Sequence, residues 1–228
     1  MSKVLSRVAL AAALFGSCAL AGLTPANATT VTWNLASPGN TDPGSTTTFS
    51  STVGPNTYTL GAAGFTSAWA ATDLYIKAGG SGENGLGINN DPTGDHEIYL
   101  NTYVRLDTTA ARSKGLTNFR FTIGSTTNGE GMDVYGSNSP NSGLTLLFSD
   151  IMAQPGLYNL SAYTYYYFTY DGAHVQSQQG DNVLLASFAG EISTTPLPAA
   201  LPLFASALGA LGLLGWRRKR KNAAAIAA

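Results

Sequence analysis

The central part of the chain, from Thr29 to Ser193, alternates short β-prone segments with clusters of turn-forming residues. The clusters contain Gly, Pro, Asn and Asp, which reverse the chain at hairpins. This pattern predicts an all-β fold, a sandwich or jelly-roll-like domain over residues 29–193. The predicted strands are Thr30–Leu35, Thr46–Val53, Thr57–Leu60, Phe65–Ala71, Leu74–Ala78, Glu97–Leu106, Asn118–Ile123, Met132–Tyr135, Leu144–Phe148, Tyr158–Tyr170 and Asn182–Ala189.

The predicted strand Asn118–Ile123 shows which side of a strand faces the core. Phe119, Phe121 and Ile123 alternate with polar residues along it. Successive side chains of a strand point to opposite faces, so one face of this strand is expected to be buried and the other wet.

The C-terminal region contains an uncharged apolar run, residues 197–216, followed directly by five cations. A helix rises about 1.5 Å per residue, so crossing a hydrocarbon core of about 30 Å takes roughly 20 residues, and this run is just long enough. We therefore expect a single transmembrane helix over 197–216, a cytoplasmic basic cluster over 217–221 and a short tail over 222–228. The cluster consists of Arg217, Arg218, Lys219, Arg220 and Lys221.

The N-terminal region has the three parts of a secretory signal peptide. Two cations, Lys3 and Arg7, precede an apolar run that ends near Leu23. Small residues at Ala26 and Ala28 predict cleavage before Thr29, which makes residues 1–28 a helical signal peptide. The one cysteine, Cys18, lies inside this segment, so the mature chain is expected to hold no disulfide and no cysteine nucleophile. A lipid anchor on Cys18 is the weaker alternative.

The tripartite tail, residues 194–221, resembles the PEP-CTERM sorting signal of Gram-negative bacteria that make exopolysaccharide. The likeness rests on the proline motif Pro196-Leu197-Pro198, the apolar run and the basic cluster occurring together. Leu197 replaces the glutamate that gives the family its name. The resemblance implies export through the Sec translocon and signal peptidase. It also implies recognition of Pro196, Leu197 and Pro198 by a membrane-embedded exosortase, after transient anchoring in the inner membrane.

Passages in the middle of the chain, such as Gly85–Ile88 and Asn182–Ala186, also loosely resemble the β-sandwich ectodomains found ahead of this tail. That resemblance implies no catalytic residues.

Charge is distributed unevenly along the chain. Seven of the 12 basic residues lie in the two end segments, whereas all 13 acidic residues lie between them, so residues 29–193 carry eight excess negative charges. Nucleic-acid binding depends on neutralising phosphates with Lys and Arg, so nucleic acid is excluded as a partner.

The segment Asn84–Ile98 is the strongest candidate for a metal site. It is interpreted as a loop that leads into a strand, and it places Asn89, Asp91, Asp95 and Glu97 close together. Calcium takes six to eight oxygen ligands, and such a loop could supply several. The alternative is an ordinary polar loop, because the spacing does not match an EF-hand. Apart from calcium, no cofactor is expected.

Tyrosines gather in the segment Tyr163–Tyr170. Strand alternation places Tyr163, Tyr165 and Tyr167 on one face, where they could stack against sugar rings. Core packing is the competing interpretation, and it is also preferred for Trp33 and Trp69.

No catalytic motif is present in the sequence: there is no nucleophile elbow, phosphate-binding loop or zinc-helix motif, and His96 and His174 are isolated. Asp95 and Glu97, two residues apart, do not by themselves give the opposed carboxylates of a glycosidase. The sequence thus predicts a non-enzymatic protein of the cell surface or exopolysaccharide matrix. A carbohydrate-binding module is the alternative, and a secreted hydrolase is the third.

Overall fold

The structure is a computed structural model that describes residues 28–79, 83–125, 130–152, 157–170, 182–193, 207–209 and 211–212. The chain divides into two compact units. One is Ala28–Ser193, and the other consists of Met1–Asn27 together with Thr194–Ala228. Of the second unit, only the helical residues 207–209 and 211–212 are described.

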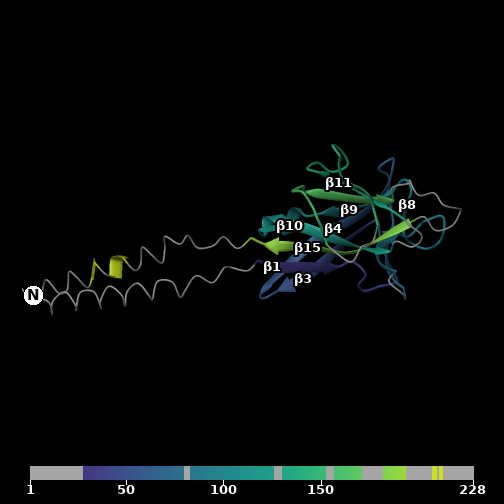
Figure 1. Ribbon diagram of the computed structural model, residues 1–228. Coiled ribbons are helices and arrows are strands. Elements are labelled where there is room, and N and C mark those ends of the chain that lie inside the picture. Colours follow the sequence, from purple (N-terminus) through teal and green to yellow (C-terminus); the bar gives the residue numbers. More distant parts are fainter. Residues whose placement is uncertain are drawn as a thin grey trace, which may run out of the picture. The chain divides into compact units, whose positions relative to one another are not determined.

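The Ala28–Ser193 unit contains two antiparallel sheets, so the all-β prediction is confirmed (Figure 1). Sheet A has eight strands, and β15 is its longest: it pairs with β10 along one edge and with β1, β7 and β8 along the other. The strands of sheet A are β13 (Tyr158–Asn159), β10 (Leu116–Ser125), β15 (Asn182–Ile192), β7 (Asn84–Ile88), β6 (Leu74–Ala78), β2 (Thr41–Gly44), β1 (Thr29–Asn34) and β8 (Ile98–Tyr99).

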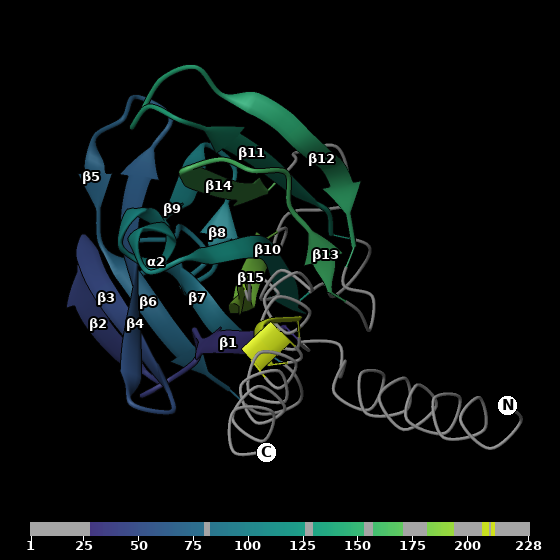
Figure 2. The same ribbon diagram turned by 90° about the vertical axis from the view of Figure 1, so that its left-hand side faces the viewer.

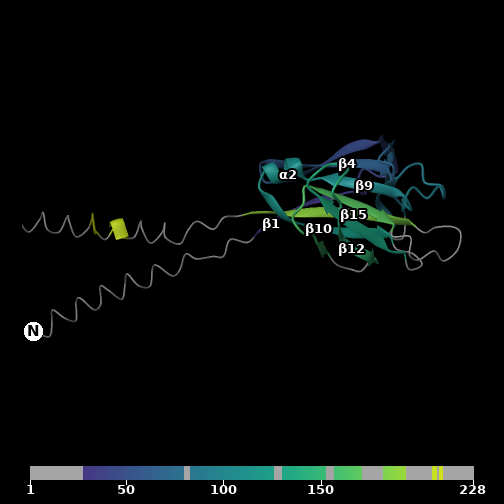
Figure 3. The same cartoon turned by 90° about the horizontal axis from the view of Figure 1, so that it is seen from above.

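Sheet B has seven strands and faces sheet A across the core (Figure 2). Its path runs from β12 through β11, β14, β9 and β4 to β3, and β5 pairs with β4. The bounds are β12 (Thr145–Ile151), β11 (Met132–Ser137), β14 (Tyr165–Tyr170), β9 (Thr102–Asp107), β4 (Asn56–Thr66), β3 (Thr46–Val53) and β5 (Ala71–Thr72). A one-turn helix, α2 (Thr109–Ser113), lies at one end of the two sheets (Figure 3).

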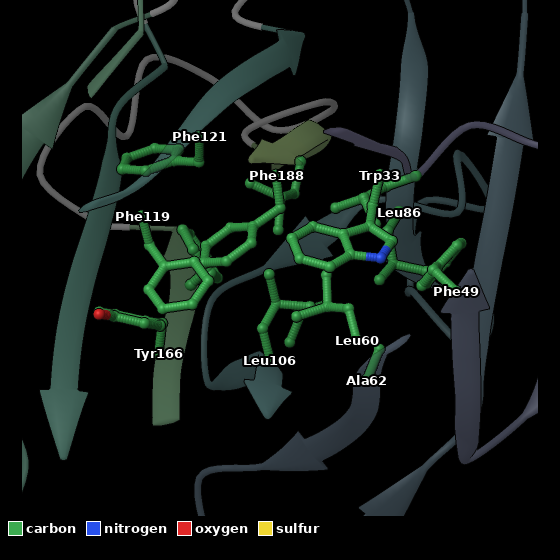
Figure 4. Packing of buried hydrophobic residues seen from close by; sticks show 14 of the residues in the cluster. Trp33, Phe49, Leu60, Ala62, Leu86, Leu106, Phe119, Phe121, Tyr166 and Phe188 are labelled. Atoms are coloured by element: carbon green, nitrogen blue, oxygen red, sulfur yellow. The ribbon is translucent and has the colours of Figure 1, made fainter. Parts of the chain in front are cut away.

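The core lies between the two sheets and is rich in aromatic rings (Figure 4). Phe188 of β15 stacks on Phe119 of β10 with ring centroids 5.5 Å apart, and Trp33 of β1 lies against the same Phe188. Trp33 is buried, and its indole N–H donates to the Tyr58 carbonyl at 3.1 Å. The large apolar surface that these rings bury provides much of the stabilisation of this unit.

The described core lies within the Ala28–Ser193 unit. Among the described residues, its cluster of buried side chains begins at Val31 and ends at Phe188. The first and last strands of the unit pair with each other, with Thr29 opposite Ile192. The two ends of the unit are therefore joined in one sheet, as is typical of a compact domain.

Several predicted strand boundaries are wrong for one physical reason, the small residues inside strands. Thr57–Leu60 and Phe65–Ala71 were predicted as two strands, but β4 runs unbroken from Asn56 to Thr66. Its Gly64 is required because an added Cβ would meet the carbonyl oxygen of Thr72 on the neighbouring strand. Asn84–Ile88, predicted as a loop, is strand β7, and its glycines likewise lie against neighbouring backbone.

Two predicted strands are each divided in the structure. Glu97–Leu106 becomes β8 and β9, separated by a tight turn in which Asn101 has φ of 66°. Tyr158–Tyr170 becomes β13 in sheet A and β14 in sheet B. The predicted burial of Phe119 and Phe121 is confirmed, and Ile123 packs partly buried against the same core.

Candidate functional site

The carboxylates of the predicted calcium loop form turn and ion-pair contacts within the domain. Asp91 is buried, and its Oδ1 accepts hydrogen bonds from the Thr93 backbone N–H at 2.7 Å and the Thr93 hydroxyl at 2.6 Å. Its Oδ2 accepts from the Glu97 backbone N–H at 3.3 Å. Asp91 thus closes the loop on itself, as aspartate commonly does in turns.

Glu97 is paired with Lys77 of β6. The Lys77 Nζ lies 2.6 Å from Glu97 Oε1 and 3.2 Å from Glu83 Oε2, and the Glu97 side chain is only 4% exposed. Burial raises the pKa of Glu97 above its usual value, and the hydrogen bond from Lys77 opposes that rise only in part. Burial alone would lower the pKa of Lys77, but the bonds and charges of Glu97 and Glu83 outweigh it and raise that pKa.

His96 fixes the loop onto the outer face of sheet A. It adopts a φ of 62°, its ring stacks on Tyr75 at 4.0 Å, and its Nδ1 lies 2.9 Å from the Asn89 carbonyl oxygen. The backbone at His96 lies directly on β7, because an added Cβ at Gly87 would meet the His96 carbonyl oxygen. The loop from Asn89 to Glu97 therefore covers β7.

The predicted calcium ligands are near one another along the chain but have different partners. The Asn89 side chain donates to Asp42, Asp91 closes its own turn, and Glu97 meets Lys77. Across the ranges that the structure describes, no group of three or more His, Cys, Asp or Glu side chains is placed to hold a metal ion. Calcium binding by Asn89, Asp91, Asp95 and Glu97 stays a prediction.

The predicted tyrosine platform is divided between two sides of sheet B. Tyr163 precedes β14 and packs against the core, where Gly136 leaves room for its ring. Tyr165 and Tyr167 lie two apart on β14 and share the outer face. Tyr167 is fully buried there, whereas Tyr165 is partly exposed.

A different set of rings joins Tyr165 and Tyr167 on that outer face. The Trp69 ring stacks on Tyr103 of β9 at 5.6 Å and meets Phe65 and Tyr167 edge-on at 6.1 Å and 5.6 Å. The Arg105 guanidinium lies over the rings of Phe65 at 4.7 Å and Tyr165 at 5.5 Å. We call these residues the aromatic patch: Phe65, Trp69, Tyr103, Arg105, Tyr165 and Tyr167.

Polar groups surround the aromatic patch. Arg105 Nη1 donates to the Asn141 side chain at 2.7 Å, and the Asn141 backbone N–H donates to the Tyr167 hydroxyl at 2.8 Å. On the neighbouring strand β11, the Tyr135 hydroxyl donates to Asp133 at 3.2 Å. Burial, followed by the Asp133 charge, raises the pKa of Tyr135, so this hydroxyl keeps its proton in the physiological range.

Sequence reasoning missed most of this patch. Trp69 was predicted to be a core residue, but it is partly exposed on the outer side of sheet B, with a φ of 60°. The useful signal was the alternation along Tyr103–Asp107, in which Val104 and Leu106 face the core and Tyr103 and Arg105 face outward.

The predicted cleavage site lies partly within the described residues. Ala28 and Thr29 are exposed, and Thr29 begins β1. Ala26, Pro196, Leu197, Pro198 and the basic cluster Arg217–Lys221 lie outside the described residues, as does His174. No helix in the described part of the chain is both long and apolar enough to cross a membrane.

Comparison of the chain with protein-family models, curated proteins and solved structures found no match.

Proposed function

We propose that this chain is an exported, non-enzymatic protein of the cell surface or exopolysaccharide matrix, sorted through its C-terminal PEP-CTERM-like signal. The support from sequence is the order of proline motif, apolar run and basic cluster over residues 194–221. The Sec translocon exports the chain, signal peptidase removes residues 1–28, and an exosortase-type enzyme processes the tail after brief anchoring by residues 197–216.

The observation that most favours this proposal is where the paired strands of the domain begin and end. Strand β1 begins at Thr29, the residue after the predicted cut, and Thr29 pairs with Ile192 at the end of β15. Cutting after Ala28 and again beyond Ser193 therefore leaves every described side chain of the core cluster, from Val31 to Phe188, in place. A domain that is trimmed at both termini during export needs this property, because each lost core side chain costs about 2–5 kcal/mol.

The test is intact mass spectrometry of the protein made in its own cell, with and without the sorting enzyme. We expect a mature product that starts at Thr29 and ends near Pro196–Pro198 only where the enzyme is present. The double variant Pro196→Ala/Pro198→Ala is expected to keep the whole tail, whereas Pro202→Ala, outside the motif, is expected to be processed normally. Recovery of an uncut chain in the cytosol would contradict the proposal.

A further inference from the structure

The aromatic patch lies on the outer face of sheet B and is formed by β4, β9, β14 and the turn that follows β4. The opposite face of the same strands already packs against the core through Leu60, Val104 and Phe168. We propose that this patch is a binding site for a neutral polysaccharide chain. The inference does not depend on how the protein is sorted.

The rings of the patch keep part of their surface accessible. Phe65, Trp69, Tyr103 and Tyr165 are each partly exposed, in contrast to the core rings of the same strands, which are buried. A pyranose ring has an apolar C–H face that matches the face of an aromatic ring, whose π-system is electron-rich. Since the patch residues come from neighbouring strands, successive sugar units of one chain can each meet a ring.

Arg105 supplies the hydrogen-bonding group at the centre of the patch. It is held between Phe65 and Tyr165, and its Nη1 is fixed by Asn141. Its Nε is buried and has no hydrogen-bond partner among the residues that the structure describes. A buried donor without a partner is unfavourable. A hydrogen bond from this Nε to a ligand hydroxyl would therefore contribute more binding free energy than a hydrogen bond from an exposed donor. The fixed position also limits the side-chain entropy lost on binding.

The left-handed backbone conformation of Trp69 indicates that the surrounding structure holds this ring in place. A left-handed φ is uncommon for a bulky residue and costs of order 1 kcal/mol or more, so it persists only where the surroundings enforce it. Here the Trp69 N–H donates to the Thr66 carbonyl at 2.9 Å, and the Thr66 N–H donates to Ala70 at 2.9 Å. These bonds close a tight turn that directs the indole over Tyr103.

The electrostatics favour a neutral glycan over an acidic one. Residues 29–193 carry eight excess negative charges, and Asp107 and Asp133 lie on the same outer face as Arg105, the one cation in the described strands of sheet B. A polyanion or an anionic membrane would be repelled by this field. A carboxylate beside an aromatic ring instead suits an uncharged sugar, because it can accept hydrogen bonds from two neighbouring hydroxyl groups of the sugar.

The experiment uses residues 28–193, the compact unit that contains the described core cluster, once a circular dichroism melt has shown that this segment is folded. This segment contains two tryptophans: Trp33 is buried in the core, and Trp69 lies in the patch. Titration with soluble laminarin, dextran, mannan and galactomannan, followed by intrinsic fluorescence and affinity electrophoresis, reports on Trp69. Alginate serves as the anionic comparison, and vesicles of phosphatidylcholine with phosphatidylglycerol test for membrane binding.

We expect saturable binding of at least one neutral polysaccharide and a change in Trp69 emission that is absent in Trp69→Phe. Tyr103→Ala and Arg105→Gln are expected to weaken that binding about tenfold. Tyr75→Ala removes a partly exposed, stacked ring from the outer face of sheet A and is the matched control, expected to leave affinity within about twofold. Circular dichroism melts show whether each variant is folded at the binding temperature, and Arg105→Lys provides a milder change if Arg105→Gln is not.

Three results would overturn the proposal. One is no binding of any neutral polysaccharide in the panel. Another is binding that folded variants at Tyr103 and Arg105 leave unchanged. The third is a preference of the patch for alginate or for vesicles.

Discussion

The outer faces of the two sheets carry different kinds of side chain. On sheet A, the loop from Asn89 to Glu97 covers β7, and polar side chains pair with one another. Arg120 of β10, for example, meets Glu191 of β15 at 2.6 Å and Thr30 of β1 at 2.8 Å, which ties three neighbouring strands together. On sheet B, the outward side chains of β9 and β14 include three rings, Tyr103, Tyr165 and Tyr167, and one arginine, Arg105.

This difference separates groups that serve the fold from groups that are available for binding. On sheet A, the Arg120–Glu191 ion pair joins two strands that are already hydrogen-bonded, and Lys77 of β6 pairs with Glu97 of the covering loop, so the effect of these pairs is structural. The rings of sheet B lie on strands whose other side chains already form the core, and their partial exposure has no comparable structural explanation. Exposed aromatic clusters on a soluble domain commonly mark interaction sites.

The largest expected contrast comes from one glycine on each outer face. Gly87→Ala on sheet A places a Cβ against the His96 carbonyl and 2.8 Å from the Glu97 Cα, so the covering loop must move. We expect a loss of about 3 kcal/mol in the free energy of unfolding, measured by urea denaturation. Gly61→Ala on sheet B places a Cβ 3.3 Å from the Asp107 Cβ and 3.8 Å from the Asp107 carbonyl oxygen, and it should change the free energy of unfolding by less than about 1 kcal/mol. Equal effects would remove the distinction between a covered and an open face.

The next contrast is the ion pair under that loop. Lys77→Met leaves the Glu97 carboxylate buried without its main counter-charge, and we expect a loss of about 3 kcal/mol at neutral pH. Glu83→Gln removes the more exposed partner of the same lysine and should cost less than about 1 kcal/mol.

The pH dependence of the stability of the Lys77→Met variant tests whether the buried Glu97 charge causes the loss. Burial already raises the pKa of Glu97, and loss of Lys77 removes the interaction that lowers it. The folded state then binds a proton more readily than the unfolded state, so stability recovers as pH falls through the raised pKa toward the usual value of 4.5. A deficit that stays constant over this window would show that lost packing, and not the buried charge, is responsible.

The sequence predicted the fold class and the inner faces better than the outer ones. Alternation identified Phe119 and Phe121 as core residues, because burial imposes a period of two on any strand next to a core. The glycines of β7 and β4 misled the strand assignment, because a glycine required by a close approach between backbones has the same letter as one that turns the chain.

The aromatic patch could be predicted only in part. Tyr165 and Tyr167 were placed on one face correctly, since both belong to β14. Phe65, Trp69 and Arg105 come from other strands and a turn, and the register of β4 with β9, which sets Phe65 opposite Tyr103, is a long-range property that local pattern does not encode.

A smaller effect is expected within the patch itself. Tyr167→Phe removes the acceptor of the Asn141 backbone N–H and should cost about 1 kcal/mol, because one hydrogen bond is lost while the ring stays. Amide hydrogen exchange gives the sharper measurement: exchange should accelerate at Asn141 but not at Ser139, whose N–H donates to the Ser137 hydroxyl in the same loop. Unchanged protection at Asn141 would contradict the role assigned to the Tyr167 hydroxyl.

The smallest expected effect returns to sheet A. The hydrogen bond from Asn118, followed by that from Arg120, lowers the pKa of Glu191 below its usual value of 4.5. A carboxylate with a lowered pKa in the folded state contributes stability that is present above the usual value and is lost as pH falls through the folded one. Glu191→Gln should therefore flatten the acid limb of stability against pH, while leaving the shape of the curve near neutral pH unchanged. Arg120→Gln removes the hydrogen bond and the charge of Arg120 but keeps the hydrogen bond from Asn118, so it should flatten the acid limb less. Glu191 joins neighbouring strands of sheet A, so its loss should change stability only. Polysaccharide binding by the aromatic patch on sheet B should be the same in Glu191→Gln as in the unmodified protein.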